Sequence, residues 1–195
     1  MTVRRATSDD VPRIAAVLAH AFAGDPPMRW VMGASPHAER RLAPYFRVLL
    51  SRLHMPRGEV WVSDEPTGAA AWIAPGEWPP PQSLELALAP VLLRTFGRHP
   101  LRASGAARVN GQGHPAEPHW YLPLIAVEPT KQGHGYGSAL LRYALERVDR
   151  EKKVAYLEST NPSNIPLYQR HGFEVVGTIQ VGDAPPLFPM VRQPR

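Results

Sequence analysis

The stretch that decides the fold is VEPTKQGHGYGSALL, residues 127–141 of a chain of 195 residues. Three alternate glycines, Gly133, Gly135 and Gly137, lie there between a strand-like run and a helix-like run. Glycine lets the backbone approach a ligand closely and adopt dihedral angles that other residues avoid. Free N–H groups at the start of a helix bind anions, and the helix dipole adds to the attraction. The stretch therefore predicts a phosphate or pyrophosphate site.

Two common nucleotide-binding loops do not fit this stretch. The P-loop pattern GxxxxGK[ST] is absent, so no lysine would reach a β- or γ-phosphate. The dinucleotide pattern GxGxxG requires its third glycine at position 138, where Ser138 stands. That loop also belongs early in a series of strands and helices, whereas this one comes two-thirds of the way along the chain. A glycine-rich turn that binds nothing remains the alternative for this stretch alone.

Hydrophobic periodicity divides the rest of the chain into strands and helices. In the second half the two kinds alternate, which predicts parallel pairing around Val127 and Leu157. Pro123 lies inside a strand-like run and indicates an edge, a bulge or local splaying. We expect strands at 2–7, 58–63, 68–74, 119–127, 153–160, 173–181 and 187–193, and helices at 8–22, 36–55, 83–99, 134–151 and 164–172.

Composition indicates one globular domain over residues 1–195, with a helical and loop insertion at 75–118. The net charge of +5 permits an anionic partner, but the basic residues are scattered, so we expect no nucleic-acid interface. The absence of cysteine excludes a disulfide, a thiolate zinc site and an acyl-cysteine intermediate. His114, Glu117 and His119 match no metal-ligand spacing, so no metal is expected. No apolar signal core or run of about 18 apolar residues is present, which predicts a cytoplasmic protein without a membrane partner.

Two separate motifs carry a family resemblance. Val127, Pro129, Gln132, Gly135 and Gly137 match the pattern V-x-P-x-x-[QR]-x-x-G-x-[GA]. Residues 161–173, NPSNIPLYQRHGF, match a second pattern, in which an asparagine lies seven residues before a tyrosine and the segment closes with Gly-Phe. Together the two motifs resemble the GNAT superfamily of acyl-CoA-dependent N-acetyltransferases. The resemblance covers 119–193 well and 1–74 more loosely, and it is nearest to the branch that contains puromycin N-acetyltransferase. It implies an α/β fold with a mixed sheet of six to seven strands, splayed at the acyl-CoA site and flanked by helices.

The resemblance implies acetyl-CoA as the cofactor. The pyrophosphate would bind N–H groups of the glycine loop, and the pantetheine arm would run along the strand that ends at Val127. Asn161 matches the family's CoA-contacting asparagine, and it or Asn164 could also cap the following helix. The cofactor-binding residues expected on this basis are Ile125, Ala126, Val127, Gln132, Gly133, His134, Gly135, Tyr136, Gly137, Ser138, Asn161, Asn164 and Tyr168.

The resemblance also implies acyl transfer to an amine. Tyr168 matches the family's general acid and would protonate the departing thiolate, while the Val127 N–H would stabilise the oxyanion. For the base three candidates stay open: His119, Tyr121, which stands where relatives often carry a glutamate or histidine, and Glu158, which ends an apolar strand. Packing or surface roles are the alternatives for each.

Candidates for the acceptor site are Asp25 and Trp30, together with Tyr121 and Glu158. Asp25 could instead be the N-cap of a helix that begins with proline. We expect acetylation of a primary amine on a small molecule, without a covalent enzyme intermediate. The alternatives are a protein lysine or N-terminal acetyltransferase and a non-catalytic acyl-CoA-binding module. Exposed strand edges near the C-terminus would allow a homodimer.

Overall fold

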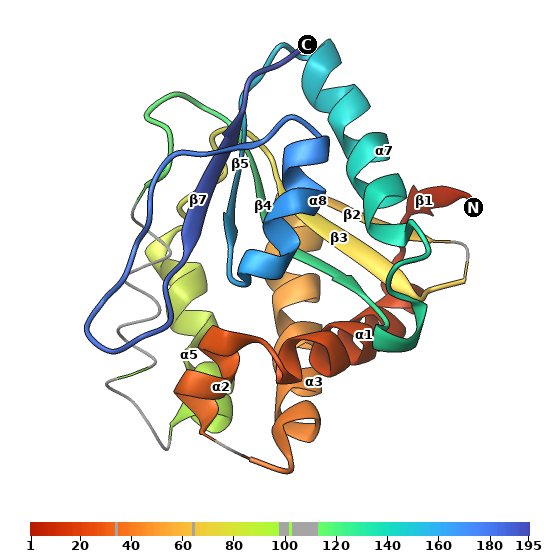
Figure 1. Ribbon diagram of the computed structural model, residues 1–195. Helices are drawn as coiled ribbons and strands as arrows, with labels where there is room; N and C mark the ends of the chain where they lie inside the picture. The colour runs from red at the N-terminus through yellow and green to blue at the C-terminus, as the bar shows by residue number, and fades with distance from the viewer. Residues whose placement is uncertain (34, 64, 98–101, 103–112) are drawn as a thin grey trace.

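A seven-stranded mixed sheet forms the centre of the molecule (Figure 1). The computed structural model describes residues 1–33, 35–63, 65–97, 102 and 113–195. The strand order across the sheet is β1-β2-β3-β4-β5-β7-β6. The last strand in the chain, β7, therefore lies between β5 and β6, and β6 forms the edge of the sheet. The strands are β1 (Val3–Arg5), β2 (Gly58–Ser63), β3 (Gly68–Ile73), β4 (Trp120–Val127), β5 (Ala155–Ser159), β6 (Glu174–Val175) and β7 (Phe188–Arg192).

Helices cover both faces of this sheet (Figure 1). Alternate residues of β3 point to opposite faces: Ala69 and Ala71 pack with α1 and α3, whereas Ala70 and Trp72 pack with α7 and α8. Each helix contributes an apolar stripe to one of these two cores. The helices are α1 (Val11–Ala23), α2 (Pro26–Met32), α3 (Ala38–Leu49), the π-helix Leu50–His54, α4 (Met55–Arg57), α5 (Gln82–Phe96), α7 (Tyr136–Arg150) and α8 (Ile165–Arg170).

The sheet splits between its two parallel strands. Strands β4 and β5 pair only at Trp120–Ala155 and Tyr121–Tyr156. The predicted parallel pairing of these two strands is confirmed, but it lies at their first residues and does not extend to Val127 and Leu157. On its other side β4 has a bulge opposite β3, between the pairs Ala71–Leu124 and Ile73–Tyr121, and this bulge contains Pro123. The sequence expectation of a bulge or splay at this proline is confirmed, and it follows because proline offers no N–H to a ladder.

Other parts of the expected pattern differ in detail. The sequence does not predict helix α2, because GDPP indicates only the end of a helix. In the structure α1 ends before Gly24, and α2 begins at Pro26 because proline is a favoured first helical residue. The expected strand at 173–181 shortens to β6 and one bridge, Ile179–Leu187. Of the insertion at 75–118, the described residues hold α5 and no strand, and the rest lies outside the described residues. Among the described residues, no helix has the length and apolarity needed to span a membrane.

Candidate functional site

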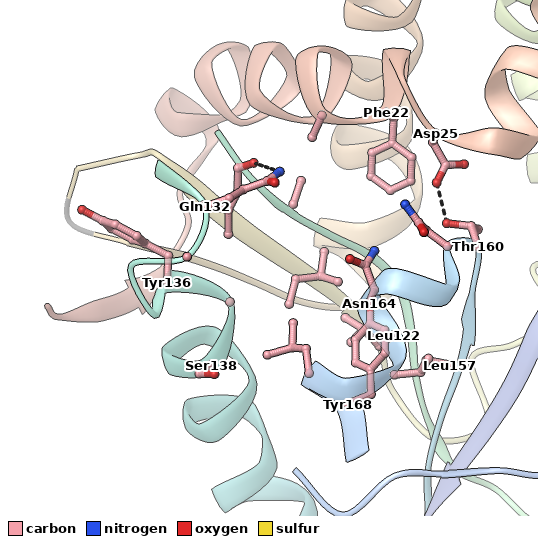
Figure 2. Close-up of a pocket in the computed structure, with 18 of the residues that line it drawn as sticks. Phe22, Asp25, Leu122, Gln132, Tyr136, Ser138, Leu157, Thr160, Asn164 and Tyr168 are labelled. Carbon is pink, nitrogen blue, oxygen red and sulfur yellow. Dashed lines mark hydrogen bonds between the residues drawn. The ribbon is translucent and has the colours of Figure 1, made fainter. Parts of the chain in front are cut away.

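A cavity of about 590 Å³ opens where β4 and β5 diverge (Figure 2). One end reaches the glycine loop and the start of α7, and the other reaches the turn between α1 and α2. The lining residues are Ala21, Phe22, Gly24, Asp25, Leu122, Pro123, Ile125, Ala126, Val127, Lys131, Gln132, Gly133, Gly135, Tyr136, Gly137, Ser138, Leu157, Glu158, Thr160, Asn161, Asn164, Leu167, Tyr168 and Arg170.

The glycine-loop end of the cavity suits an anion. Gly135 has a left-handed conformation with φ of 84° and precedes the first residue of α7. Because Ala139 N–H closes the first helical bond onto the Gly135 carbonyl at 3.0 Å, the N–H groups of the three residues between them precede the helix ladder. Lys131 and Arg170 line the same cavity. Backbone donors and the helix dipole can therefore act together on a phosphate group, in a cavity that two cations also line.

Two of the glycines have distinct structural reasons. A Cβ at Gly137 would lie 3.3 Å from Leu167 Cδ2, so glycine allows α7 and α8 to approach closely. At Gly135 a Cβ would meet no atom within 4 Å, so the space beside it is open. Nearby, the Gln132 side chain donates a hydrogen bond to the Val127 carbonyl at 3.2 Å. The loop thus combines a packing glycine with one that leaves room for a ligand.

Tyr168 comes from α8 and is 6% exposed. Its ring packs edge-on against Phe173, with centroids 6.2 Å apart. Burial raises the pKa of the Tyr168 hydroxyl, and the nearby negative charge of Asp25 raises it further. The hydroxyl therefore keeps its proton at neutral pH and can donate it.

Asp25 lies at the end of the cavity that is opposite the glycine loop (Figure 2). The Thr160 hydroxyl donates a hydrogen bond of 2.5 Å to Asp25 Oδ1, whereas the buried Oδ2 has no hydrogen-bond partner among the described residues. Burial raises the pKa of Asp25, and the bond from Thr160 and an interaction with the Met28 N–H oppose that shift. This carboxylate can accept a donor that enters the cavity.

Glu158 lines the cavity from β5, and its side chain is only 5% exposed. The hydroxyls of Tyr121 and Tyr156 hydrogen-bond to its carboxylate. His114 Nε2 lies 3.3 Å from Glu158 Oε1, close enough for an ion pair but outside hydrogen-bond geometry, so within the described chain Oε1 has no hydrogen-bond partner. Burial, and then the charge of Glu158, raises the pKa of Tyr121.

Glu158 and Tyr168 reach this cavity from opposite faces of the sheet. On β5, Glu158 shares the face of Tyr156, whose side chain packs with Tyr121, whereas Leu157 faces the core that contains Tyr168. Both side chains can approach the same cavity because the strands part beyond Tyr121. A proton acceptor and a proton donor thus lie on the two sides of one gap.

Several predicted site residues do not line the cavity. Tyr121 and His119 belong to the cluster behind Glu158. Trp30 accepts a hydrogen bond on its carbonyl from Arg102, whose guanidinium lies 5.3 Å from the indole centroid. In the glycine loop, His134 Nδ1 bonds the Gln132 carbonyl at 2.9 Å. The other predicted residues line the cavity.

The asparagines before α8 have different roles. Asn161 Oδ1 accepts a hydrogen bond of 3.0 Å from the Ser163 N–H and caps the 3₁₀ turn Pro162–Asn164. Asn164 makes no side-chain capping bond. Both line the cavity, so Asn161 combines a capping role with a place at the site.

The lining residues that the sequence did not predict as site residues include Phe22, Lys131, Thr160 and Arg170. Lys131 and Arg170 each lie within a few residues of a motif position, which is a signal that could have found them. Thr160 likewise adjoins the motif residue Asn161. Phe22 carries no such signal, since only the fold brings the end of α1 to the end of β5.

Comparison with known proteins shows which family this arrangement resembles. Residues 97–173 match the model of the acetyltransferase (GNAT) family. That region holds β4, the glycine loop, α7, β5 and α8, and with them most of the cavity. This part of the chain therefore resembles a GNAT acetyltransferase domain. The enzyme is accordingly a transferase of the N-acetyltransferase class.

Other similar proteins match the whole length of the chain. An uncharacterized N-acetyltransferase from Schizosaccharomyces pombe is 25% identical, covering 100% of this chain and 84% of that protein. A Corynebacterium glutamicum structure described as a histone acetyltransferase and related acetyltransferase is 29% identical, with a TM-score of 0.77 over 100% of this chain and 96% of that one. A Salmonella typhimurium protein solved with its cofactor acetyl-CoA shares the fold at 19% identity and a TM-score of 0.55, covering 98% and 92% of the two chains.

Proposed function

We propose that this GNAT enzyme transfers an acetyl group from acetyl-CoA to a primary amine on a small molecule. One observation carries the proposal: a single cavity joins the glycine loop to the gap that Glu158 and Tyr168 both line, from opposite faces of the sheet. The order of features along that cavity is the order that a pyrophosphate, an extended arm and a reacting thioester require.

The residues present fit acetyl-CoA. The N–H groups at the start of α7, together with Lys131 and Arg170, offer donors and positive charge for the pyrophosphate. Gly135 leaves open space beside them. Further along, Leu122, Ile125 and Leu157 give the cavity apolar walls suited to the pantetheine arm. Binding along β4 is possible because its edge beyond Tyr121 is not paired with β5.

Acetyl-CoA supplies an activated thioester carbonyl. Glu158 is the proposed base that removes a proton from the amine, since its carboxylate faces the cavity and Oε1 has no hydrogen-bond partner among the described residues. Tyr168 is the proposed acid, because its raised pKa keeps a proton available for the leaving sulfur. The Val127 N–H is the proposed oxyanion donor.

The acceptor end of the cavity favours a cation. Asp25 Oδ2 and Glu158 Oε1 are buried oxygens without hydrogen-bond partners in the described structure, and Phe22 adds an apolar wall. An ammonium group bound to Asp25 would satisfy a buried carboxylate that is otherwise costly. The two carboxylates therefore support a small amine as the acceptor. The likeness to the puromycin N-acetyltransferase branch is the reason to include an aminonucleoside among the amines in the assay.

A protein acceptor is the second candidate. The Corynebacterium glutamicum relative, at 29% identity, is described as a histone acetyltransferase. A lysine or N-terminal amine would use the same base and acid.

A cytoplasmic location and a homodimer stay predictions, to be checked by cell fractionation and sedimentation.

A thiol-release assay tests the proposal. The purified chain would be given acetyl-CoA and a panel of puromycin, 2-phenylethylamine, spermidine, a lysine peptide and a peptide with a free N-terminus. We expect CoA release with a small amine and a raised melting temperature with acetyl-CoA alone. Release only with a peptide would favour the protein-acetyltransferase alternative, and a thermal shift without any turnover would indicate a binding module. Absence of a thermal shift at millimolar acetyl-CoA would overturn the cofactor assignment.

A further inference from the structure

Two hydrogen-bonded histidines form a chain of close polar contacts behind Glu158. His114 Nε2 lies 3.3 Å from Glu158 Oε1, and His114 Nδ1 lies 3.0 Å from His119 Nε2. His119 Nδ1 in turn lies 2.8 Å from the Glu117 carbonyl oxygen. The chain begins at a carboxylate in the cavity and ends at a half-buried ring next to the exposed Glu117.

The contacts fix where the ring protons lie. A carbonyl oxygen only accepts, so His119 Nδ1 must carry a proton and donate it to Glu117. In the neutral ring His119 Nε2 is then an acceptor, and His114 Nδ1 must be its donor. A neutral His114 would therefore turn the lone pair of Nε2 toward Glu158 Oε1. The two atoms attract each other only when one additional proton lies between them.

Aromatic rings hold His114 in this position. Trp78 stacks on its ring with an interplanar angle of 13° and a centroid distance of 5.5 Å. Tyr121 and Tyr156 pack against it with centroids 4.6 and 4.3 Å away. The His114 side chain is 10% exposed. The ring therefore has little freedom to leave the line between Glu158 and His119.

We propose that His114 and His119 form a proton relay that carries the amine proton from Glu158 to solvent. The inference rests on the proposed function, in which Glu158 is the base. The proton taken by Glu158 passes from Oε1 to His114 Nε2, and the proton on His114 Nδ1 passes to His119 Nε2. His119 is then an imidazolium that releases one proton to water, so the net change is one proton moved from the amine to solvent.

The surroundings of His119 favour release at that end. Burial lowers the pKa of His119, opposed by its bond to the Glu117 carbonyl; the charge of His114 lowers it further, and the carboxylates of Glu117 and Glu158 oppose this. An imidazolium formed there gives up its proton readily near neutral pH. Because both histidines act through Glu158, they are positioning residues rather than groups in contact with the amine.

Histidine NMR tests the direction of the chain without an acceptor. The eight histidines would be ¹⁵N-labelled, and the two signals assigned from the variants His114→Gln and His119→Gln. We expect His119 as the Nδ1–H tautomer at pH 8, and we expect Glu158→Gln to change the proton occupancy of His114 Nε2. An Nε2–H tautomer at His119, or a His114 spectrum indifferent to Glu158→Gln, would overturn the relay.

Kinetics test its use in turnover, with the fastest amine of the panel as the probe. We expect His119→Gln to lower kcat about tenfold, less than loss of a direct base, with an unchanged KM for acetyl-CoA and a larger solvent deuterium isotope effect. Added imidazole should restore His119→Ala, whose site is near solvent. The exposed His37→Gln is the matched control and should behave as the original protein.

The outcomes separate the relay from the enzyme assignment. If amines are acetylated but His119→Gln keeps the original kcat and pH profile, the relay is wrong and the function stands. A kcat loss in His119→Ala that imidazole does not restore would also count against a relay and favour a packing role. If the original protein acetylates no amine, the proposed function fails, and the relay fails with it.

Discussion

The Thr160 hydroxyl donates a 2.5 Å hydrogen bond to Asp25 across the acceptor end of the cavity (Figure 2). The bond joins the end of β5 to the turn between α1 and α2, two segments that are 135 residues apart. It engages one carboxylate oxygen and leaves the other oriented for a further donor. Asp25 is therefore held in place but not satisfied, which is the state expected of a binding group.

Replacement of Asp25 by asparagine should weaken the acceptor and spare the cofactor. The amide side chain would retain a bond with Thr160 but would lack the charge that attracts an ammonium group. We expect Asp25→Asn to raise the KM for the amine roughly 10- to 100-fold, as for a lost charged hydrogen bond of about 1.5–3 kcal/mol. The KM for acetyl-CoA should stay within about twofold. The exposed Asp183→Asn is the control, and equal amine KM values in both variants would remove Asp25 from the acceptor site.

The same substitution should stabilise the fold in a pH-dependent manner. Burial raises the folded-state pKa of Asp25 above the ordinary 3.8, so the folded state binds the proton more tightly than the unfolded state does. Stability is then lost as pH rises through this window, and a neutral asparagine avoids the loss. Urea unfolding should show Asp25→Asn as more stable at pH 7, with the difference closing below about pH 4. A variant that is less stable at pH 7 would contradict this.

Tyr168→Phe should remove the proton donor with little change in packing. We expect kcat to fall roughly 10²- to 10⁴-fold, with the KM for acetyl-CoA nearly unchanged. Because burial raises the pKa of Tyr168, the original enzyme should show no alkaline loss of rate from this residue below about pH 10. Tyr143→Phe, on the exposed side of α7, is the matched control. Unchanged turnover in Tyr168→Phe would exclude it as the acid.

At the glycine-loop end, most residues named from the sequence line the cavity because that end is local. The residues that form it lie on one strand, one loop and one helix start, so their spacing in the chain fixes their arrangement in space. The bulge at Pro123 is equally local, since it follows from a missing N–H. These features depend on backbone chemistry within a few residues.

The acceptor end depends on tertiary contacts and is much harder to predict. Thr160 meets Asp25 only because the sheet brings the end of β5 to the end of α1. From the sequence, His114 is a candidate only for a metal ligand, because nothing in the adjacent sequence indicates that its side chain lies beside Glu158. The strand expected at 173–181 is short for a related reason. Val175 and Val176 are 40% and 58% exposed at the sheet edge, so these apolar side chains do not pack into the core.

Gly135→Val should separate a ligand-binding glycine from a mere turn. Gly135 has φ of 84°, and a valine there would be strained by roughly 1–3 kcal/mol and would fill the open space beside the N–H groups. Gly76 is a matched control, because it has φ of 83°, is equally open and does not line the cavity. We expect both valine variants to lose similar stability, while only Gly135→Val weakens acetyl-CoA binding more than about tenfold by calorimetry, a loss of about 1.4 kcal/mol. Equal affinity in the two would show that the glycine serves the turn alone.

His54 should make the fold sensitive to acid. It lies in the π-helix before β2, it is 2% exposed, and its Nδ1 has no hydrogen-bond partner within the described residues. Burial lowers the pKa of His54 to about 4. The unfolded chain therefore binds a proton at a higher pH than the folded chain, and stability is lost as pH falls from about 6.5 toward 4.

The loss assigned to His54 is about 3 kcal/mol, from about 1.4 kcal/mol per pKa unit. His54→Leu should lack this part, so urea unfolding at pH 7 and pH 4 should give a difference about 3 kcal/mol smaller than in the original protein. The exposed His37→Leu should keep the full difference. An identical pH response in His54→Leu and the original protein would show that His54 is protonated without cost, and that acid lability arises at another group.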